Sequence, residues 1–301
     1  MKIHFLVVRR VPPVPSPVLL EVYDILRRRD YEVGESIAEE SVVSPDRIAA
    51  THDLYVVKSH TELSLSLAGV LDTQGAMLLN PYRSCITTQD KIVASRRLRA
   101  ASVPIPRGWI TGDLRLLREV LEGSPLIVKP HRGHRGAGIR VIHHAWELED
   151  DPLPEGAVIA QEYLGEPGED LKVYVIGKQV LGVRKPFSSD SFTRAGQPCA
   201  VDESVVQIAR RCGEVLGLGL YGLDIIQTNI GPKVVDVNYF PGYKGVPDAA
   251  ELIADYIDEY ARGRATLELP SLRIADEVGI DEVGGDEVVR AEGSNAYVAL
   301  S

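Results

Sequence analysis

The sequence has few cysteines and no long apolar run, and each absence excludes a class of protein. Its 301 residues contain three cysteines, which are widely spaced and form no Cys-x-x-Cys pair. This pattern argues against a disulfide-stapled secreted domain and against a thiolate zinc site. The apolar run at Met1–Val8 is too short for a signal-peptide core, and no later stretch is long enough to span a bilayer. We therefore expect a protein of the reducing cytoplasm with no membrane partner.

Positive charge is also in deficit. The 33 basic residues face 43 acidic ones, for a formal net charge of -10. A broad nucleic-acid-binding face needs an excess of positive charge, so we expect no nucleic-acid partner. The acidic excess is concentrated at residues 271–301, where Asp-Glu-Val recurs at positions 276, 281 and 286. Such a segment is typical of a disordered tail.

The amino-terminal part alternates short apolar runs with a helical pattern. Ile3–Val8 and Leu54–Val57 have the composition of buried strands, and the apolar residues of Val18–Leu26 recur at helical spacing. Strand, helix and strand together predict an open α/β unit that ends near residue 85. Asn80-Pro81 makes continued regular structure unfavourable there, and Thr88 or its neighbour is expected to cap a following helix.

The remaining pattern indicates antiparallel strands with helices. Two short strands that flank a glycine loop, Leu126–Lys129 and Ile139–Ile142, predict a small lid. Two hairpins and a final helix capped by Asp248 are expected after it. The hairpin strands are Leu171–Ile176 with Gln179–Val183, and Tyr221–Gln227 with Lys233–Asn238. The predicted fold class is thus α/β and α+β, with a C-terminal β-sheet and helices.

Three oxygen-bearing side chains on the second hairpin suggest a metal site. Asp236 and Asn238 are two residues apart and so share one face of their strand, while Asp224 lies on the other arm. Two carboxylates and an amide oxygen suit Mg²⁺, which completes its shell with water and substrate phosphates. The alternative is an amphipathic strand that faces solvent. The apolar neighbours favour the metal, because burying unpaired carboxylates among them would be costly.

Two lysines and a glycine loop are candidates for binding phosphate. Lys129 ends a strand and precedes a flexible basic loop with glycines, and Lys91 lies at the positive end of a predicted helix. The alternatives are an exposed hairpin tip and an ordinary surface lysine. The loop glycines are Gly133, Gly136 and Gly138.

A third group has the character of a purine and ribose site. The strand that ends in Gln161, Glu162, Tyr163 and Leu164 stops at a Gly-Glu-Pro-Gly hinge, where exposed backbone could bond a purine edge. Glu169 or Asp170 could then reach ribose hydroxyls. The alternative for these acids is a solvated loop, because acidic loop residues are normally exposed.

The order of these features resembles the ATP-grasp superfamily over roughly residues 1 to 262. Five ordered landmarks are far more specific than any one of them. They are Gln89-Asp90-Lys91, Ile127-Val128-Lys129-Pro130, the glycine loop, Gln161-Glu162-Tyr163-Leu164, and Asp224 followed by Asp236-Val237-Asn238. The resemblance implies an ATP-grasp fold and ATP chemistry. It divides the chain into a pre-ATP-grasp domain at 1–85, a central domain with the lid at 86–165, a C-terminal domain at 166–270 and the acidic tail at 271–301.

Two branches of the superfamily match different motifs. The Lys129 loop and Leu79-Asn80-Pro81 are similar to the ribosomal-S6-modification type of glutamate ligase, in which an acid is activated as an acyl phosphate and attacked by an amine. The segments Lys172–Gly177 and Asp236–Tyr243 are similar to inositol 1,3,4-trisphosphate 5/6-kinases, which phosphorylate a hydroxyl. The chain departs from the ligase pattern in having Asp236 where glutamate is usual and Lys172 where arginine is usual. The ligase, acting on a small acid and an amine, is the leading hypothesis, and a kinase acting on a polyol phosphate is the alternative.

The resemblance also implies roles for individual residues. ATP would be bound with two Mg²⁺ ions, or Mn²⁺ in their place, held by Asp224, Asp236 and Asn238. Lys172 joins the nucleotide-binding set. Arg184 or Lys185 is expected to hold the carboxylate or phosphate of the acceptor, with help from Lys58. The alternative for these three cations is plain exposure to solvent.

Overall fold

The computed structural model describes residues 1–10, 14, 16–133, 137–150, 154–165, 169–186 and 196–270. They divide into two compact units: Met1–Ile105 with the described part of Glu166–Ile274, and Pro106–Gly165. The predicted tail at 271–301 lies outside the described residues, as do three of the four residues of the Gly165–Gly168 hinge. The domain boundaries placed near residues 85, 165 and 270 stay predictions.

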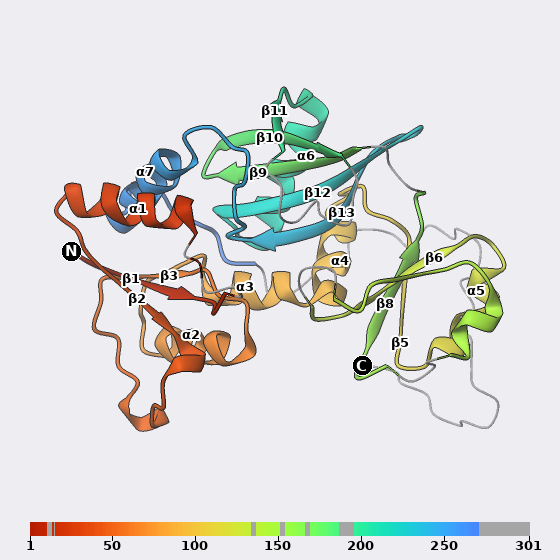
Figure 1. Ribbon diagram of the computed structural model, residues 1–301, viewed down its shortest axis with the longest axis horizontal. Helices are drawn as coiled ribbons and strands as arrows, with labels where there is room; N and C mark the ends of the chain where they lie inside the picture. Colours follow the sequence, from red (N-terminus) through yellow and green to blue (C-terminus); the bar gives the residue numbers. More distant parts are fainter. Residues whose placement is uncertain are drawn as a thin grey trace. The chain divides into compact units, whose positions relative to one another are not determined.

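The first unit begins with a parallel sheet of order β2-β1-β3-β4 (Figure 1). Its alternation of strands and helices confirms the predicted open α/β unit. Strand β2 was missed because its side chains are partly exposed and give no apolar run. The strands are β1 (Lys2–Val7), β2 (Glu32–Ile37), β3 (Leu54–Val57) and β4 (Leu78–Leu79), connected through the helices α1 (Pro17–Arg28) and α2 (Glu62–Thr73) and the 3-10 turns η1 (Ala38–Glu40) and η2 (Pro45–Arg47).

Two consecutive helices, α3 (Tyr82–Gln89) and α4 (Lys91–Ala100), follow β4. Helix α3 begins directly after Pro81, so the proline starts a helix instead of ending regular structure. The cap of α4 is Asp90, not Thr88: its Oδ1 accepts hydrogen bonds of 3.1 Å from the N–H groups of Ile92 and Val93. Thr88 lies inside α3.

An antiparallel sheet of order β11-β10-β9-β12-β13 completes the first unit, and both predicted hairpins are confirmed in it. Asp248 stands at the N-cap of the last helix, but its side chain makes no capping hydrogen bond. Helix α1 lies beside this last helix (Figure 1), and Arg29 is paired there with Glu251 and Asp255. The elements are β9 (Glu169–Ile176), β10 (Gln179–Pro186), β11 (Gln197–Cys199), α6 (Glu203–Leu216), β12 (Leu220–Thr228), β13 (Gly231–Tyr239) and α7 (Ala249–Ala261).

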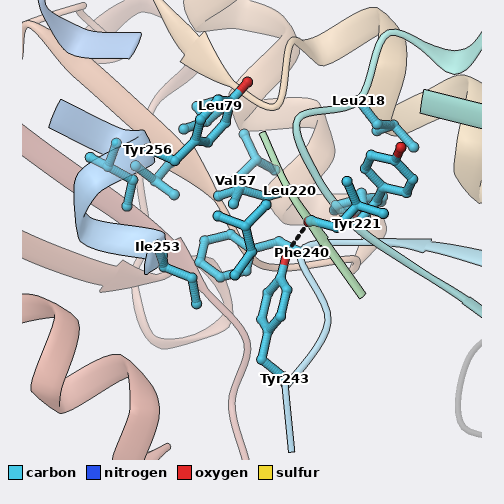
Figure 2. Close-up of a cluster of buried hydrophobic side chains, with 14 of the residues drawn as sticks. Val57, Leu79, Leu218, Leu220, Tyr221, Phe240, Tyr243, Ile253 and Tyr256 are labelled. Carbon is cyan, nitrogen blue, oxygen red and sulfur yellow. Dashed lines mark hydrogen bonds between the residues drawn. The ribbon is translucent and has the colours of Figure 1, made fainter. Parts of the chain in front are cut away.

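One hydrophobic core joins the two sheets of the first unit (Figure 2). Tyr243 is 1% exposed in this core, and its hydroxyl donates to the Val175 carbonyl at 3.1 Å. Asn80 is fully buried between the sheets. Its Oδ1 accepts from the N–H groups of Gly219 and Leu220 at 2.8 and 3.0 Å, and its Nδ2 donates to the Leu220 carbonyl at 2.8 Å. This satisfied amide ties the end of β4 to the start of β12.

The second unit is a small antiparallel sheet of order β5-β8-β6-β7 with its own apolar core. Its β6–β7 pair confirms the predicted lid strands. The elements are β5 (Gly108–Thr111), η3 (Leu114–Leu117), α5 (Arg118–Leu121), β6 (Leu126–Pro130), β7 (Arg140–Ile142), η4 (Ala145–Leu148) and β8 (Val158–Glu162). Among the described residues of both units, no helix combines the length and hydropathy that crossing a bilayer requires.

Candidate active site

A row of charged residues crosses three strands of the antiparallel sheet in the first unit. Lys172 on β9 is directly opposite Asp224 on β12, and Asp224 is directly opposite Asp236 on β13. Residues in direct register project from the same face of a sheet. The Lys172 Nζ accordingly lies 2.7 Å from the Asp224 Oδ1. The strand pairing thus places Asp224 and Asp236 on one face of the sheet.

The start of helix α4 adds a second lysine to this row. Lys91, the first residue of α4, forms an ion pair with Asp236. The Asn238 Nδ2 donates to the other oxygen, Oδ2, of the same carboxylate at 3.1 Å. The structure therefore brings Lys91 together with the three predicted oxygen donors, Asp224, Asp236 and Asn238. The carboxylate side chains are 33% and 30% exposed, so this metal face, defined by these residues and Lys172, is accessible from solvent.

Gly222 lets the chain after β13 pack closely against the metal face. It is directly opposite Asn238 in the sheet. A Cβ at this position would lie 3.0 Å from Pro241 Cγ and 3.2 Å from Tyr174 Cδ1. The missing side chain thus permits the close approach of the loop that follows the two metal-face residues of β13.

A second row, next to the first, contains Asp170 and Lys185, which are directly opposite each other on β9 and β10. Lys185 is only 4% exposed. Burial lowers its pKa, and the nearby charges of Lys172 and Lys244 lower it further, against Asp224 and Asp170. Burial raises the pKa of Asp170, with Asp224 adding to it and Lys172 and Lys185 opposing it.

The pKa of Lys172 is shifted in the opposite direction to that of Lys185. Burial alone would lower its pKa, but the charge and hydrogen bond of Asp224, with the charges of Asp170 and Asp236, outweigh burial and raise it. The pKa values of these two lysines on adjacent strands therefore shift in opposite directions, because the charge and hydrogen bond of Asp224 outweigh burial at Lys172, whereas burial dominates at Lys185.

The two residues expected to hold the acceptor are separated by the sheet. Arg184 precedes Lys185 on β10, and successive residues of a strand point to opposite faces. Arg184 is exposed and is directly opposite Leu171 and Gln197. Lys185 is thus the member of this pair that shares a face with the carboxylates. Glu169 lies at the start of β9, and its side chain is outside the described residues.

The remaining predicted residues belong to the second unit. Lys129 is 7% exposed, and its Nζ donates to the Gln161 Oε1 at 2.8 Å. The N–H groups of Glu162 and Tyr163 donate to the carbonyls of Arg107 and Pro125, both at 2.9 Å. A purine edge would therefore have to be bonded by groups other than these two donors. Leu164 follows β8 and is partly buried.

The glycine loop of the second unit is described at both of its ends. Gly133 and Gly138 are exposed, and Gly136 lies outside the described residues. Gly138 has φ +73°, and a Cβ there would lie 2.8 Å from Pro130 Cγ. Glycine is required at this position both by the left-handed backbone and by the contact with Pro130.

The donor set of the metal face fits Mg²⁺. Among the described residues, no three histidine, cysteine or acidic side chains gather into a metal cage. Two carboxylates with one amide oxygen, open to solvent, instead match a cation that keeps several waters and takes oxygens from phosphates. Lys91 and Lys172 neutralise the two carboxylates in this structure. The residues present can therefore hold Mg²⁺.

Sequence reasoning did not identify the cation Lys244 or the main-chain contacts of Lys58. Lys244 follows Tyr243 in the loop after β13, and its charge reaches Lys185. Lys244 lies six residues after Asn238 in the sequence, and this proximity was the feature from which it could have been identified. The Lys58 Nζ donates to the main-chain carbonyls of Phe240 and Pro241, at 2.6 and 3.0 Å.

The chain is similar in sequence to a known domain family and to named proteins. The sequence profile of the ATP-grasp domain matches residues 88–241. A probable alpha-L-glutamate ligase of Xanthomonas euvesicatoria pv. vesicatoria is 28% identical over 233 residues, which cover 69% of this chain and 77% of the relative. Beta-citrylglutamate synthase B of Danio rerio is 25% identical over 272 residues, which cover 83% of this chain and 67% of that protein.

A solved structure has a similar fold. The crystal structure of a RimK domain ATP-grasp protein from Sphaerobacter thermophilus superposes with a TM-score of 0.67 at 18% identity, covering 85% of this chain and 99% of the other. With half of the chain matched by the profile and the landmark residues on the expected strands, the predicted superfamily is confirmed: this protein belongs to the ATP-grasp family.

Proposed function

We propose that this protein is an ATP- and magnesium-dependent ligase that joins a carboxylate to an amine through an acyl phosphate. The observation that carries the proposal is the metal face, where two carboxylates, an amide oxygen and two lysines meet across β9, β12, β13 and the start of α4. Phosphoryl transfer depends on positioning and charge stabilisation, and this set of side chains supplies both.

Each group has a proposed task. Asp224, Asp236 and Asn238 would hold Mg²⁺, either two ions or Mn²⁺ in their place, and the metal neutralises phosphate charge when it is bound. Lys91 and Lys172 would turn from the carboxylates toward phosphate oxygens. Lys129 is the proposed phosphate lysine of the second unit. The other nucleotide-binding residues proposed there are Gly133, Gly136, Gly138, Gln161, Glu162, Tyr163 and Leu164, with Glu169 and Asp170 of the first unit as ribose ligands.

The proposed reaction has two steps. A carboxylate oxygen of the acid attacks the γ-phosphorus of ATP, and ADP leaves. The amine nitrogen then attacks the acyl carbon, inorganic phosphate leaves, and the nitrogen loses a proton as the amide forms. In both steps the protein must exclude water, because water would hydrolyse ATP in the first step and the acyl phosphate in the second.

The cations beside the metal face favour an anionic acceptor. Lys185 is buried on this face, and the charge of Lys244 reaches it. Two neighbouring ammonium groups can hold a carboxylate. Because the two relatives are named as glutamate ligase and citrylglutamate synthase, we propose an acidic α-amino acid such as glutamate as the amine substrate.

A product assay tests the proposed function. The purified full chain is incubated with Mg-ATP and with carboxylic acids and amino acids, separately and in pairs. ADP and free phosphate should appear only when both an acid and an amine are present, together with an amide product detected by mass spectrometry. A phosphorylated polyol that forms without free phosphate would reject the ligase in favour of the kinase.

A further inference from the structure

Lys58 is a conspicuous charged group of the first unit that the proposed chemistry leaves without a task. It directly follows β3, where its own N–H and that of Ser59 both donate to the Leu6 carbonyl, at 2.9 and 2.8 Å. Its side chain is half-buried, and the ammonium lies 4.8 Å from the centre of the Phe240 ring. With the hydrogen bonds to the Phe240 and Pro241 carbonyls, the ammonium is held by the turn that ends β13.

This turn has an unusual backbone. Phe240 has φ +35°, which a residue with a side chain rarely adopts, and its N–H donates to the Leu220 carbonyl at 2.7 Å. Its ring is 3% exposed and belongs to the same buried cluster as Val57, the residue before Lys58 (Figure 2). A backbone held in a sparsely populated region needs surrounding contacts that fix it. Lys58 supplies two charge-assisted hydrogen bonds of that kind.

A second connection joins the same two segments. The Tyr239 hydroxyl donates to the Ser59 carbonyl at 2.8 Å and lies 3.2 Å from the Gln89 Oε1. The Gln89 Nε2 donates to the His60 carbonyl at 2.7 Å. Gln89 ends α3, two residues before Lys91. Residues 58–60 are thus bonded both to the end of β13 and to the α3–α4 junction.

These contacts connect the α3–α4 junction to the end of β13 by two routes. One route is the ion pair between Lys91 and Asp236. The other route runs from the α3–α4 junction through Gln89 to residues 58–60, and from there to the turn that follows Asn238. The position of Lys91 relative to Asp236 and Asn238 is therefore fixed by two separate sets of contacts. If phosphate and metal separate the ion pair, the second connection still keeps the two segments together.

We propose that Lys58 is a positioning residue for the metal face: by holding the Phe240–Pro241 turn, it fixes Asp236 and Asn238 relative to Lys91. The inference rests on the proposed function, because it assigns Lys58 to the site where that function places magnesium and phosphate. It also differs from the expectation that Lys58 touches the acceptor, because the ammonium is directed at main-chain carbonyls.

The test is a binding measurement that needs no turnover. Binding of Mn²⁺ in the presence of the non-hydrolysable analogue AMPPNP is followed by electron paramagnetic resonance for the wild type, Lys58→Met, Lys58→Arg and the control Lys178→Met. Lys178 is an exposed lysine in the β9–β10 turn. Lys58→Met should weaken Mn²⁺ binding about tenfold, the scale of a lost hydrogen bond to a charged group. Lys58→Arg should restore much of the loss, because a guanidinium can donate to both carbonyls, and the control should bind like wild type.

Activity measurements separate the two roles of Lys58. A positioning role predicts a higher KM for Mg-ATP in Lys58→Met with an unchanged KM for the acceptor. Wild-type Mn²⁺ binding in Lys58→Met, with an increase confined to the acceptor KM, would overturn the proposal and leave the proposed function intact. A wild-type protein that fails to bind Mn²⁺ and AMPPNP would remove the proposed function and this inference with it.

Thermal unfolding shows whether each variant folds. If Lys58→Met does not fold, Lys58→Gln takes its place, because it keeps a polar donor but removes the charge of the ammonium. It should weaken Mn²⁺ binding about threefold, as expected when hydrogen bonds from a charged group are replaced by a neutral one. Wild-type binding by a folded Lys58→Gln variant would then overturn the proposal.

Discussion

Lys91 in the first unit and Lys129 in the second are both proposed to bind phosphate, but they are held in different ways. Lys91 is ion-paired with the Asp236 carboxylate, and its side chain is 17% exposed. Lys129 is more deeply buried, and it donates to the neutral amide oxygen of Gln161. An ammonium already paired with a carboxylate must exchange partners to bind phosphate. The contact between the Lys129 ammonium and Gln161 is with a neutral oxygen, so an anion that replaced Gln161 there would add a charge-assisted contact.

The largest effect is expected when the carboxylate of the Lys91 pair is removed. Asp236→Asn keeps the shape of the side chain but removes the charge that pairs with Lys91 and that is proposed to hold Mg²⁺. Turnover should fall by about 10²–10³-fold, the scale of losing one electrostatic contact to a transition state. Because both partners are partly exposed, we expect the fold to lose only about 1 kcal/mol. ADP release and urea unfolding measure the two quantities.

The matched control for this change is Asp72→Asn, at an exposed position of α2. It should leave turnover and stability at wild-type values. If Asp236→Asn instead turned over ATP like wild type, with the same dependence on Mg²⁺ concentration, Asp236 would not be a metal ligand.

A smaller effect on catalysis is expected when Lys129 is replaced. Lys129→Met should raise the KM for ATP by about tenfold to a hundredfold, because a charge-assisted contact to phosphate is lost. Its stability should change little, because removal of a buried charge is offset by loss of the hydrogen bond to the buried Gln161 amide. ATP titration and thermal unfolding test both parts, with Lys178→Met as the control. A destabilised variant with an unchanged KM would show that Lys129 has a structural role.

Two lysines on neighbouring strands of the first unit allow a finer version of the comparison. The pKa of Lys172 is raised above the ordinary 10.5, so its ion pair stabilises the fold fully below pH 10.5 and is lost as pH rises through the folded-state pKa. Lys172→Met should therefore lower the free energy of unfolding by about 2 kcal/mol at pH 7, between the values for exposed and buried pairs.

Lys185 should behave in the opposite way. Its pKa lies below 10.5, so the unfolded chain binds more protons than the fold between the folded-state pKa and 10.5. Stability contributed at this site therefore rises with pH in that interval. Lys185→Met should match or exceed wild-type stability at pH 7, and this advantage should shrink as pH approaches 10.5. Urea unfolding of metal-free protein at neutral and alkaline pH measures it; a larger loss at pH 7 for Lys185→Met than for Lys172→Met would contradict the assignment.

The parts of the fold that depend on local pattern could be predicted from sequence. The two hairpins follow from alternating residues and short turns, and the same alternation places Asp236 and Asn238 on one face. The parallel unit follows from apolar runs separated by a helical pattern. The edge strand β2 and the short helix α3 were missed because neither has a strong periodic apolar signal.

The parts that depend on distant pairing could not be predicted in the same way. Alternation alone shows that Arg184 and Lys185 point to opposite faces. Which of them joins the carboxylates depends on the register of β10 against β9, and this register is set by packing across the whole sheet. The contacts of Lys58 join residues 182 and 183 positions apart, and no local pattern specifies them.

The smallest effect is expected at Arg184, and it tests the register directly. Arg184 is exposed on the face opposite Lys185, so Arg184→Gln should change the KM for ATP and the Mg²⁺ requirement by less than about twofold, as surface substitutions usually do. Arg210→Gln, at an exposed position of α6, is the control. A tenfold loss of ATP affinity in Arg184→Gln alone would show that this arginine reaches the nucleotide, and the assignment of faces on β10 would then be wrong. An increase confined to the acceptor KM would instead place the acceptor at Arg184, away from the buried Lys185, because the strand cannot direct both side chains to one ligand on the metal face.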